Sequence, residues 1–173
     1  MRRQSLAAGL LTLLLLPACG GKGGGTTTPP GQKQKVIGFS MDTLKEERWQ
    51  RDRDLVVAEA EKLGARVIVQ AANGNDAMQN SQAENMLTQG VDVMLVAPHN
   101  GKTAAVIVEA AHKAGVPVIA YDRLILDSDL DLYVTFSPVR VGEQQGDYAL
   151  KHKPRGNYVL IGGAPTDNNA LLL

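Results

Sequence analysis

Three junctions of the same form recur along the chain, and they constrain its fold more than any other feature. The segments KLGARVIV, TQGVDVML and KAGVPVIA each place a glycine between a helical stretch and a short run rich in β-branched residues. Glycine readily adopts the left-handed conformation that ends many helices, so Gly64, Gly90 and Gly115 are predicted to follow three helices. The repeat therefore predicts that helices and strands alternate along the chain.

This alternation defines the elements of a sheet and of the helices that connect its strands. Strands are predicted over 35–41, 66–72, 92–98, 117–122 and 132–136, and helices over about 46–63, 76–89 and 101–114. The strands are apolar along most of their length, which indicates burial on both faces of the sheet. We therefore predict an α/β fold with a doubly wound parallel sheet.

The composition narrows the class of function. The 173 residues carry 18 basic and 18 acidic side chains, so the chain has no net positive field and we expect no nucleic acid as a partner. A single cysteine and three scattered histidines offer no metal-ligand spacing. Neither a dinucleotide-binding glycine motif nor a nucleophile elbow is present in the sequence. We expect no metal, no cofactor and no enzymatic activity.

The N-terminal segment has the order of an export signal. In residues 1–18, two arginines follow the initial methionine, an apolar run extends from Leu6 to Leu16, and small residues come next. The sequence Leu-Pro-Ala-Cys resembles a bacterial lipobox, which predicts lipid attachment at Cys19 and a membrane anchor. An ordinary cleaved signal that leaves an unpaired thiol is the alternative. The glycine-rich and Thr/Pro-rich residues 19–34 are predicted to form a flexible linker.

Polar side chains follow the predicted strands at the edge where such sheets bind ligands. In chain order they are Asp42, Asn73, Asn75, His99, Asn100, Asp122 and Arg123. These groups form hydrogen bonds but include no nucleophile paired with a base, so they predict a site that holds a polar molecule. For Asp42, Asn73 and Asn100, capping of the next helix is the favoured alternative. For Asp122 and Arg123, the alternative is a surface ion pair.

The only tryptophan lies in the highly charged segment KEERWQRDRD. Trp49 precedes Val56 by seven residues and Leu63 by fourteen, so on a helix the three share one stripe facing the sheet, and spacing alone favours a core role. The same position lies in the first helical turn, beside the carboxyl end of the first strand. There an indole can stack on a sugar ring while Arg48 and Arg123 bind hydroxyls. The two roles are compatible.

Five segments resemble the D-xylose-binding proteins of bacterial ABC sugar importers, within the ribose-binding-like periplasmic proteins. They are ERWQRDRD, ANGN, GVDVMLVAPHNG, VIAYDRLILDSDLDLYVTF and GNYVLIGGAPTDNNA. The resemblance covers about Lys35 to Ala170. It implies two α/β lobes that trap D-xylose or a related pentose between them and deliver it to a membrane permease. The ligands it implies are Arg48, Trp49, Asp122 and Arg123 from the first lobe, and Asp167 and Asn169 from the second.

The same resemblance divides the chain into a first lobe, 35–137, and the start of a second lobe, 138–173. Ser137 and Pro138 at this boundary also have the residue types of an N-cap and a first helical position. Beyond them the sequence predicts one helix, at about 139–152, and one strand in NYVLIGG. This is too little for a complete second lobe, so we expect the chain to be the front part of a longer protein. The alternatives are a sugar-binding regulatory or chemosensory domain of the same fold, and a non-functional fragment.

Overall fold

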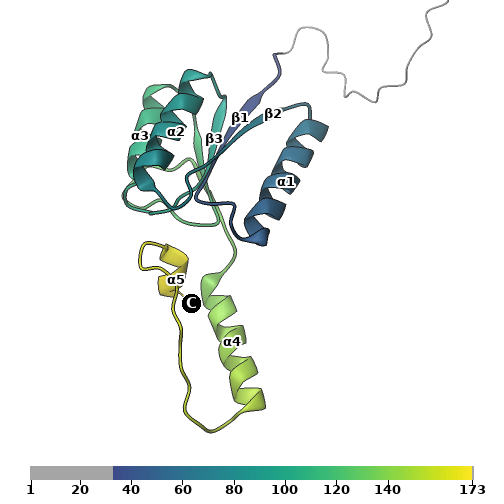
Figure 1. Ribbon diagram of the computed structural model, residues 1–173, viewed down its shortest axis with the longest axis vertical. Coiled ribbons are helices and arrows are strands. Elements are labelled where there is room, and N and C mark those ends of the chain that lie inside the picture. Colours follow the sequence, from purple (N-terminus) through teal and green to yellow (C-terminus); the bar gives the residue numbers. More distant parts are fainter. Residues whose placement is uncertain (1–32, 173) are drawn as a thin grey trace, which may run out of the picture.

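A computed structural model describes residues 33–172, and a parallel sheet flanked by helices forms its centre (Figure 1). The strands are β1 Val36–Met41, β2 Arg66–Ala71, β3 Val93–Ala97, β4 Val118–Tyr121 and β5 Leu132–Val134. The helices are α1 Glu47–Lys62, α2 Asp76–Thr88, α3 Ala105–Lys113, α4 Pro138–His152 and α5 Asn168–Leu172. The predicted signal peptide, Cys19 and all but the end of the linker lie outside the described residues.

The sheet has the strand order β2-β1-β3-β4-β5, and every neighbouring pair is parallel. Helix α1 covers one face, and α2 and α3 cover the other (Figure 1). The chain leaves β1 in one direction to form β2 and returns past it to form β3, so the winding reverses between β1 and β3. The predicted doubly wound α/β fold is confirmed. Ligand sites in such sheets lie at the carboxyl ends of the strands on either side of this reversal.

Alternation along β1 builds a core on each face of the sheet. Phe39 and Met41 are fully buried and pack with Trp49 beneath α1. On the other face Gly38 lies close to the sulfur atoms of Met86 and Met94, where α2 packs against the sheet. An apolar cluster therefore lies on each face of the sheet, as the sequence predicted for a buried parallel sheet.

The predicted helix ends are confirmed at three glycines. Gly64, Gly90 and Gly115 have φ angles of 82°, 76° and 71°, in the left-handed region where a side chain is unfavourable. At the predicted boundary between the two lobes, the Ser137 side chain accepts a hydrogen bond from the Arg140 backbone N–H, and Pro138 occupies the first position of α4. The N-cap predicted there is therefore also confirmed.

Two local predictions are wrong. Leu63 is 75% exposed because it follows Lys62, the last residue of α1, and so leaves the stripe that Trp49 begins. The segment NYVLIGG forms no strand, and the side chains of Val159, Leu160 and Ile161 are exposed. A strand needs a neighbour to accept and donate its backbone hydrogen bonds, and no described strand lies beside this segment. Within residues 33–172 no helix has the length and apolar composition needed to cross a bilayer.

Gly38→Ala is expected to lower stability by about 1–3 kcal/mol, because overpacking a filled core forces its neighbours to shift. A Cβ atom at this position would lie 2.7 Å from the Met94 sulfur and 3.2 Å from a Val91 methyl carbon. Urea unfolding followed by circular dichroism measures the change. Gly146→Ala is the control: a Cβ there meets nothing within 4 Å, and alanine favours the helix. Equal stability of the two variants would contradict the packing described here.

Asp131→Asn is expected to lower the unfolding midpoint at neutral pH. The Val118 backbone N–H and the His112 ring hold the pKa of the Asp131 carboxyl below its usual value. A lowered pKa stabilises the fold above the unfolded value of about 3.9, and this stabilisation is lost as the pH falls through the folded value. The deficit of the variant should therefore shrink below about pH 4. Thermal unfolding between pH 3 and 7 tests this, with the exposed Asp129→Asn as the control.

Candidate functional site

The carboxyl end of the sheet and the last residues of the chain enclose a pocket of about 510 Å³. Its lining residues are Asp42, Thr43, Glu46, Arg48, Trp49, Asp122, Arg123, Phe136, Gly163, Asp167, Asn169 and Ala170. All six ligand candidates from the sequence line this one pocket: Arg48, Trp49, Asp122, Arg123, Asp167 and Asn169. Residues more than 100 positions apart in the chain are thus brought to one place by the fold.

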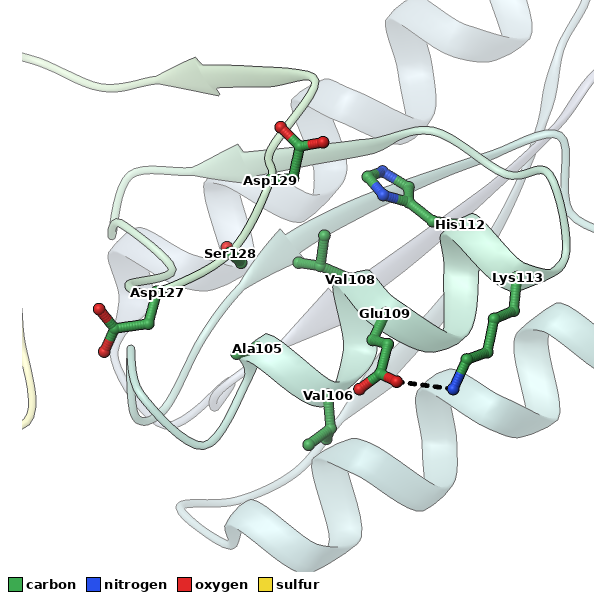
Figure 2. Close-up of a pocket in the computed structure, with 9 residues that line it drawn as sticks. All are labelled: Ala105, Val106, Val108, Glu109, His112, Lys113, Asp127, Ser128 and Asp129. Atoms are coloured by element: carbon green, nitrogen blue, oxygen red, sulfur yellow. Dashed lines mark hydrogen bonds and ion pairs between the residues drawn. The ribbon is translucent and has the colours of Figure 1, made fainter.

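A larger pocket, of about 570 Å³, lies between α3 and the loop 127–129 (Figure 2). Two of its charged groups, Glu109 and Lys113, already pair with each other at 2.6 Å. Its histidine, His112, pairs with Asp131 at 2.9 Å. None of the ligand candidates lines it, so we place the functional site at the carboxyl end of the sheet despite the smaller volume there.

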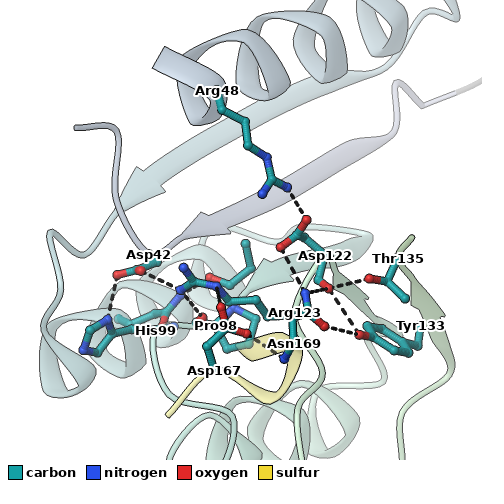
Figure 3. A network of polar contacts seen from close by, with 12 residues as sticks. Asp42, Arg48, Pro98, His99, Asp122, Arg123, Tyr133, Thr135, Asp167 and Asn169 are labelled. Atoms are coloured by element: carbon teal, nitrogen blue, oxygen red, sulfur yellow. Dashed lines mark hydrogen bonds and ion pairs between the residues drawn. The ribbon is translucent and has the colours of Figure 1, made fainter. Parts of the chain in front are cut away.

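A tight turn after β4 presents Asp122 to the pocket. Asp122 has a φ of 64°, and the Arg123 backbone N–H donates to the Tyr121 carbonyl oxygen at 2.7 Å. The Asp122 carbonyl oxygen accepts three hydrogen bonds, from Tyr133 at 3.2 Å, Thr135 at 2.7 Å and Asn169 at 2.9 Å (Figure 3). A left-handed conformation is unfavourable for a residue with a side chain, and it persists where surrounding contacts fix it. These three donors hold the turn in place.

Arg123 lies between two carboxylates. Its Nη1 atom donates to Asp42 Oδ2 at 2.7 Å and to the Pro98 carbonyl oxygen at 3.2 Å, and its Nε atom is 3.0 Å from Asp167 Oδ2 (Figure 3). The Asp122 side chain pairs instead with Arg48. The alternative of a surface ion pair between Asp122 and Arg123 is therefore wrong. Arg123 connects the end of β1 to the C-terminal segment of the described chain.

Capping explains only some of the polar groups that follow the strands. Asn100 accepts a hydrogen bond from the Lys102 backbone N–H at 3.0 Å in the turn before α3, but the N-cap of that helix is Ala104, so the capping alternative is wrong for Asn100. The N-cap of α2 is Asn75, which accepts from the Met78 backbone N–H at 2.8 Å, whereas Asn73 has a φ of 53° in the preceding turn. Asp42 caps no helix, because both of its carboxylate oxygens bind side chains.

Trp49 belongs to the core and also reaches the pocket. It is only 4% exposed and packs with Phe39 and Met41. The guanidinium carbon of Arg48 lies 4.3 Å from the centre of the indole ring, and that of Arg123 lies 5.4 Å from it. Cations over an indole face are attracted to its π-electrons. The core role favoured by spacing is confirmed, and the indole meanwhile fixes the positions of two guanidinium groups.

Two buried or half-buried polar residues beneath the site were not singled out from the sequence. Burial, together with the negative charge of Asp52, raises the pKa of Tyr121 to about 12, so its hydroxyl stays protonated at physiological pH. The buried Gln79 side chain donates to Ser40 Oγ at 3.2 Å and to the Ala97 carbonyl oxygen at 3.0 Å. Tyr121 is an ordinary residue for the end of a strand and Gln79 for a helix, so the sequence does not distinguish them. Only the tertiary fold shows what they contact.

Residues 37–172 match the family described as "Periplasmic binding protein domain". The chain belongs to the periplasmic binding proteins. It is 51% identical to a D-xylose-binding periplasmic protein of Haemophilus influenzae and 49% identical to one of Escherichia coli, over 140 residues and 81% of this chain in each case. This periplasmic binding protein spans 42% of the length of each of these relatives.

Solved structures support the same fold. This periplasmic binding protein superposes with a TM-score of 0.74 on a carbohydrate transporter solute binding protein from Chloroflexus aurantiacus, determined in complex with D-glucose. The two are 36% identical, and the match covers 82% of this chain and 42% of the other. The proteins named in these comparisons are binding proteins of sugar transport, and none is named as an enzyme.

The backbone turn at position 122 can be tested by its residue requirements. We expect Asp122→Gly to be more stable than Asp122→Ala by roughly 1 kcal/mol, because glycine takes the left-handed conformation without the cost that alanine meets. Both variants lose the pairing with Arg48, so their difference isolates the backbone. Chemical denaturation measures it. An alanine variant at least as stable as the glycine variant would show that the turn does not require a positive φ.

Proposed function

We propose that this periplasmic binding protein binds D-xylose, or a closely related pentose, outside the cytoplasm. The observation that carries the proposal is the convergence of Arg48, Trp49, Asp122, Arg123 and, from the C-terminal segment, two more polar side chains on one pocket. The names of its relatives support the choice of sugar, since two D-xylose-binding proteins are about half identical to it.

The chemistry of the pocket suits a sugar. Planar guanidinium, carboxylate and amide groups can each address two neighbouring hydroxyls in a fixed geometry. Arg48 and Asp122 form one pair at the pocket, and Arg123 and Asp167 form another, so donors and acceptors lie side by side. The Trp49 indole supplies an apolar wall for the ring carbons. A sugar that lacks one hydroxyl would leave a buried polar group unpaired, which gives the site its selectivity.

The proposed role is transport rather than catalysis. We infer that residues 35–137 form one sugar-binding lobe and that residues 138–173 begin a second, joined near Ser137 and Pro138. The bound sugar passes to an ABC transporter permease. Export by the signal in residues 1–18 and lipid attachment at Cys19 would hold the protein at the outer surface of a membrane. A diacylated N-terminus fits this role because two acyl chains give stable anchoring.

Titration of the full chain with D-xylose, followed by calorimetry and by tryptophan fluorescence, tests the proposal. Trp49 is the only tryptophan, so any change in emission comes from the site. We expect saturable heat and a saturable emission change with D-xylose, and weaker binding of D-glucose because of its additional exocyclic carbon. We expect this chain to bind more weakly than a complete two-lobed protein, which supplies more ligands to the sugar. The titration should therefore extend to high sugar concentrations.

Arg123→Ala should lower the affinity by about 10-fold to 100-fold, the usual effect of removing a charged hydrogen-bonding group. Glu109→Gln, in the pocket beside α3, is the matched control and should bind as the wild type does. Absence of both heat and emission change in the wild-type chain would contradict the proposed function. An Arg123→Ala variant that is folded and binds normally would contradict the proposed site.

A further inference from the structure

His99 lies directly behind the carboxylate that holds Arg123. Its Nδ1 atom is 2.9 Å from Asp42 Oδ1, while the other oxygen of the same carboxylate accepts from Arg123 at 2.7 Å (Figure 3). An ionised carboxylate only accepts hydrogen bonds, so the proton of this contact belongs to His99 Nδ1. His99 itself does not line the pocket of the ligand candidates. It reaches that pocket only through Asp42.

His99 is in turn fixed at its backbone. Its backbone N–H donates to Gln79 Oε1 at 2.9 Å, and Gln79 is buried and bound to both β1 and β3. On the other side of the ring, Nε2 lies 3.8 Å from Asp76 Oδ1 at the start of α2, which is too far for a hydrogen bond. The backbone of His99 is therefore attached to the interior of the sheet, and its ring is oriented by the contact of Nδ1 with Asp42. Such supporting contacts determine how well a binding group is oriented.

The alternative contacts of Asp42 are few. Its side chain is 8% exposed, so water cannot easily replace a lost partner. Without the donor from His99, the oxygen that now faces the imidazole would be left unpaired. The carboxylate would then rotate so that both of its oxygens approach Arg123. Arg123 would move with it, because the two groups are joined by a short charged hydrogen bond. Arg123 also lies over the Trp49 ring, so the displacement would reach the indole.

We propose that His99 is a positioning residue of the sugar site: through Asp42 it holds the Arg123 guanidinium in the orientation that binds the ligand. This inference rests on the proposed function, since it assigns His99 a part in sugar binding. It also extends the site beyond the residues that line the pocket, to a chain of contacts from Gln79 through His99 and Asp42 to Arg123.

The test compares three variants of the full chain. His99→Leu removes the donor, His99→Gln keeps a polar group but displaces it, and His99→Asn places an amide N–H near the position of Nδ1. We expect D-xylose affinity to fall on the order of tenfold in the leucine and glutamine variants, and to be largely restored in the asparagine variant. Without sugar, Trp49 emission should shift in the first two variants and stay near the wild-type value in the third.

His112→Leu is the matched control. His112 also pairs with an aspartate at 2.9 Å, but that pair is remote from the site, so the variant should leave both affinity and Trp49 emission unchanged. Urea unfolding of every variant separates a loss of stability from a loss of positioning. If the leucine variant does not fold, the comparison of glutamine with asparagine decides the question, since both are polar and only asparagine keeps the donor in place.

The outcomes distinguish the two proposals. A wild-type chain that shows no response to D-xylose contradicts the proposed function. A wild-type chain that binds D-xylose, together with His99→Leu and His99→Gln variants that bind it equally well, overturns the positioning role alone. The same conclusion follows if the asparagine variant is as weak as the glutamine variant, because the donor at Nδ1 would then be irrelevant.

Discussion

The pairing of Arg123 with Asp42 and Asp167 is the interaction on which the site depends. It joins the end of β1, the turn after β4 and the C-terminal segment at a single guanidinium. Largely buried charges are costly unless they are paired and hydrogen-bonded, so each of the three side chains needs the others. Helix α4 packs against α5 and has only Pro138 buried, which leaves the pocket contacts as the main connection of residues 138–172 to the sheet.

The sheet itself could be predicted from the sequence because its determinants are local. Glycines at three helix ends and apolar runs between them specify where helices and strands alternate, and burial on both faces follows from those runs. The segment NYVLIGG has an equally apolar sequence but forms no strand. The difference is not in its residues: a strand is stable only beside another strand, and sequence propensity does not report whether one is present.

The site could be predicted only in part. Asp122 and Arg123 were recognisable because polar residues follow an apolar strand, whereas Asp167 and Asn169 were implied by resemblance alone. The role of Asp42 was misjudged as a helix cap, since its partner Arg123 is 81 residues away in the chain. Gln79 gave no signal at all. Its amide is buried between two strands, and contacts of this kind follow from the packing of the fold rather than from any local pattern.

The left-handed turn at Asp122 also limits how the specificity of the proposed sugar site can change. Few residues adopt a positive φ at low cost: glycine does so freely, and asparagine and aspartate do so more readily than other side chains. The backbone therefore favours aspartate, asparagine or glycine at this position, and an apolar or cationic side chain costs about 1–2 kcal/mol before any ligand is considered. Adaptation of the proposed sugar site to a different ligand is therefore least costly at the neighbouring positions, while the backbone favours a small polar side chain, or none, at position 122.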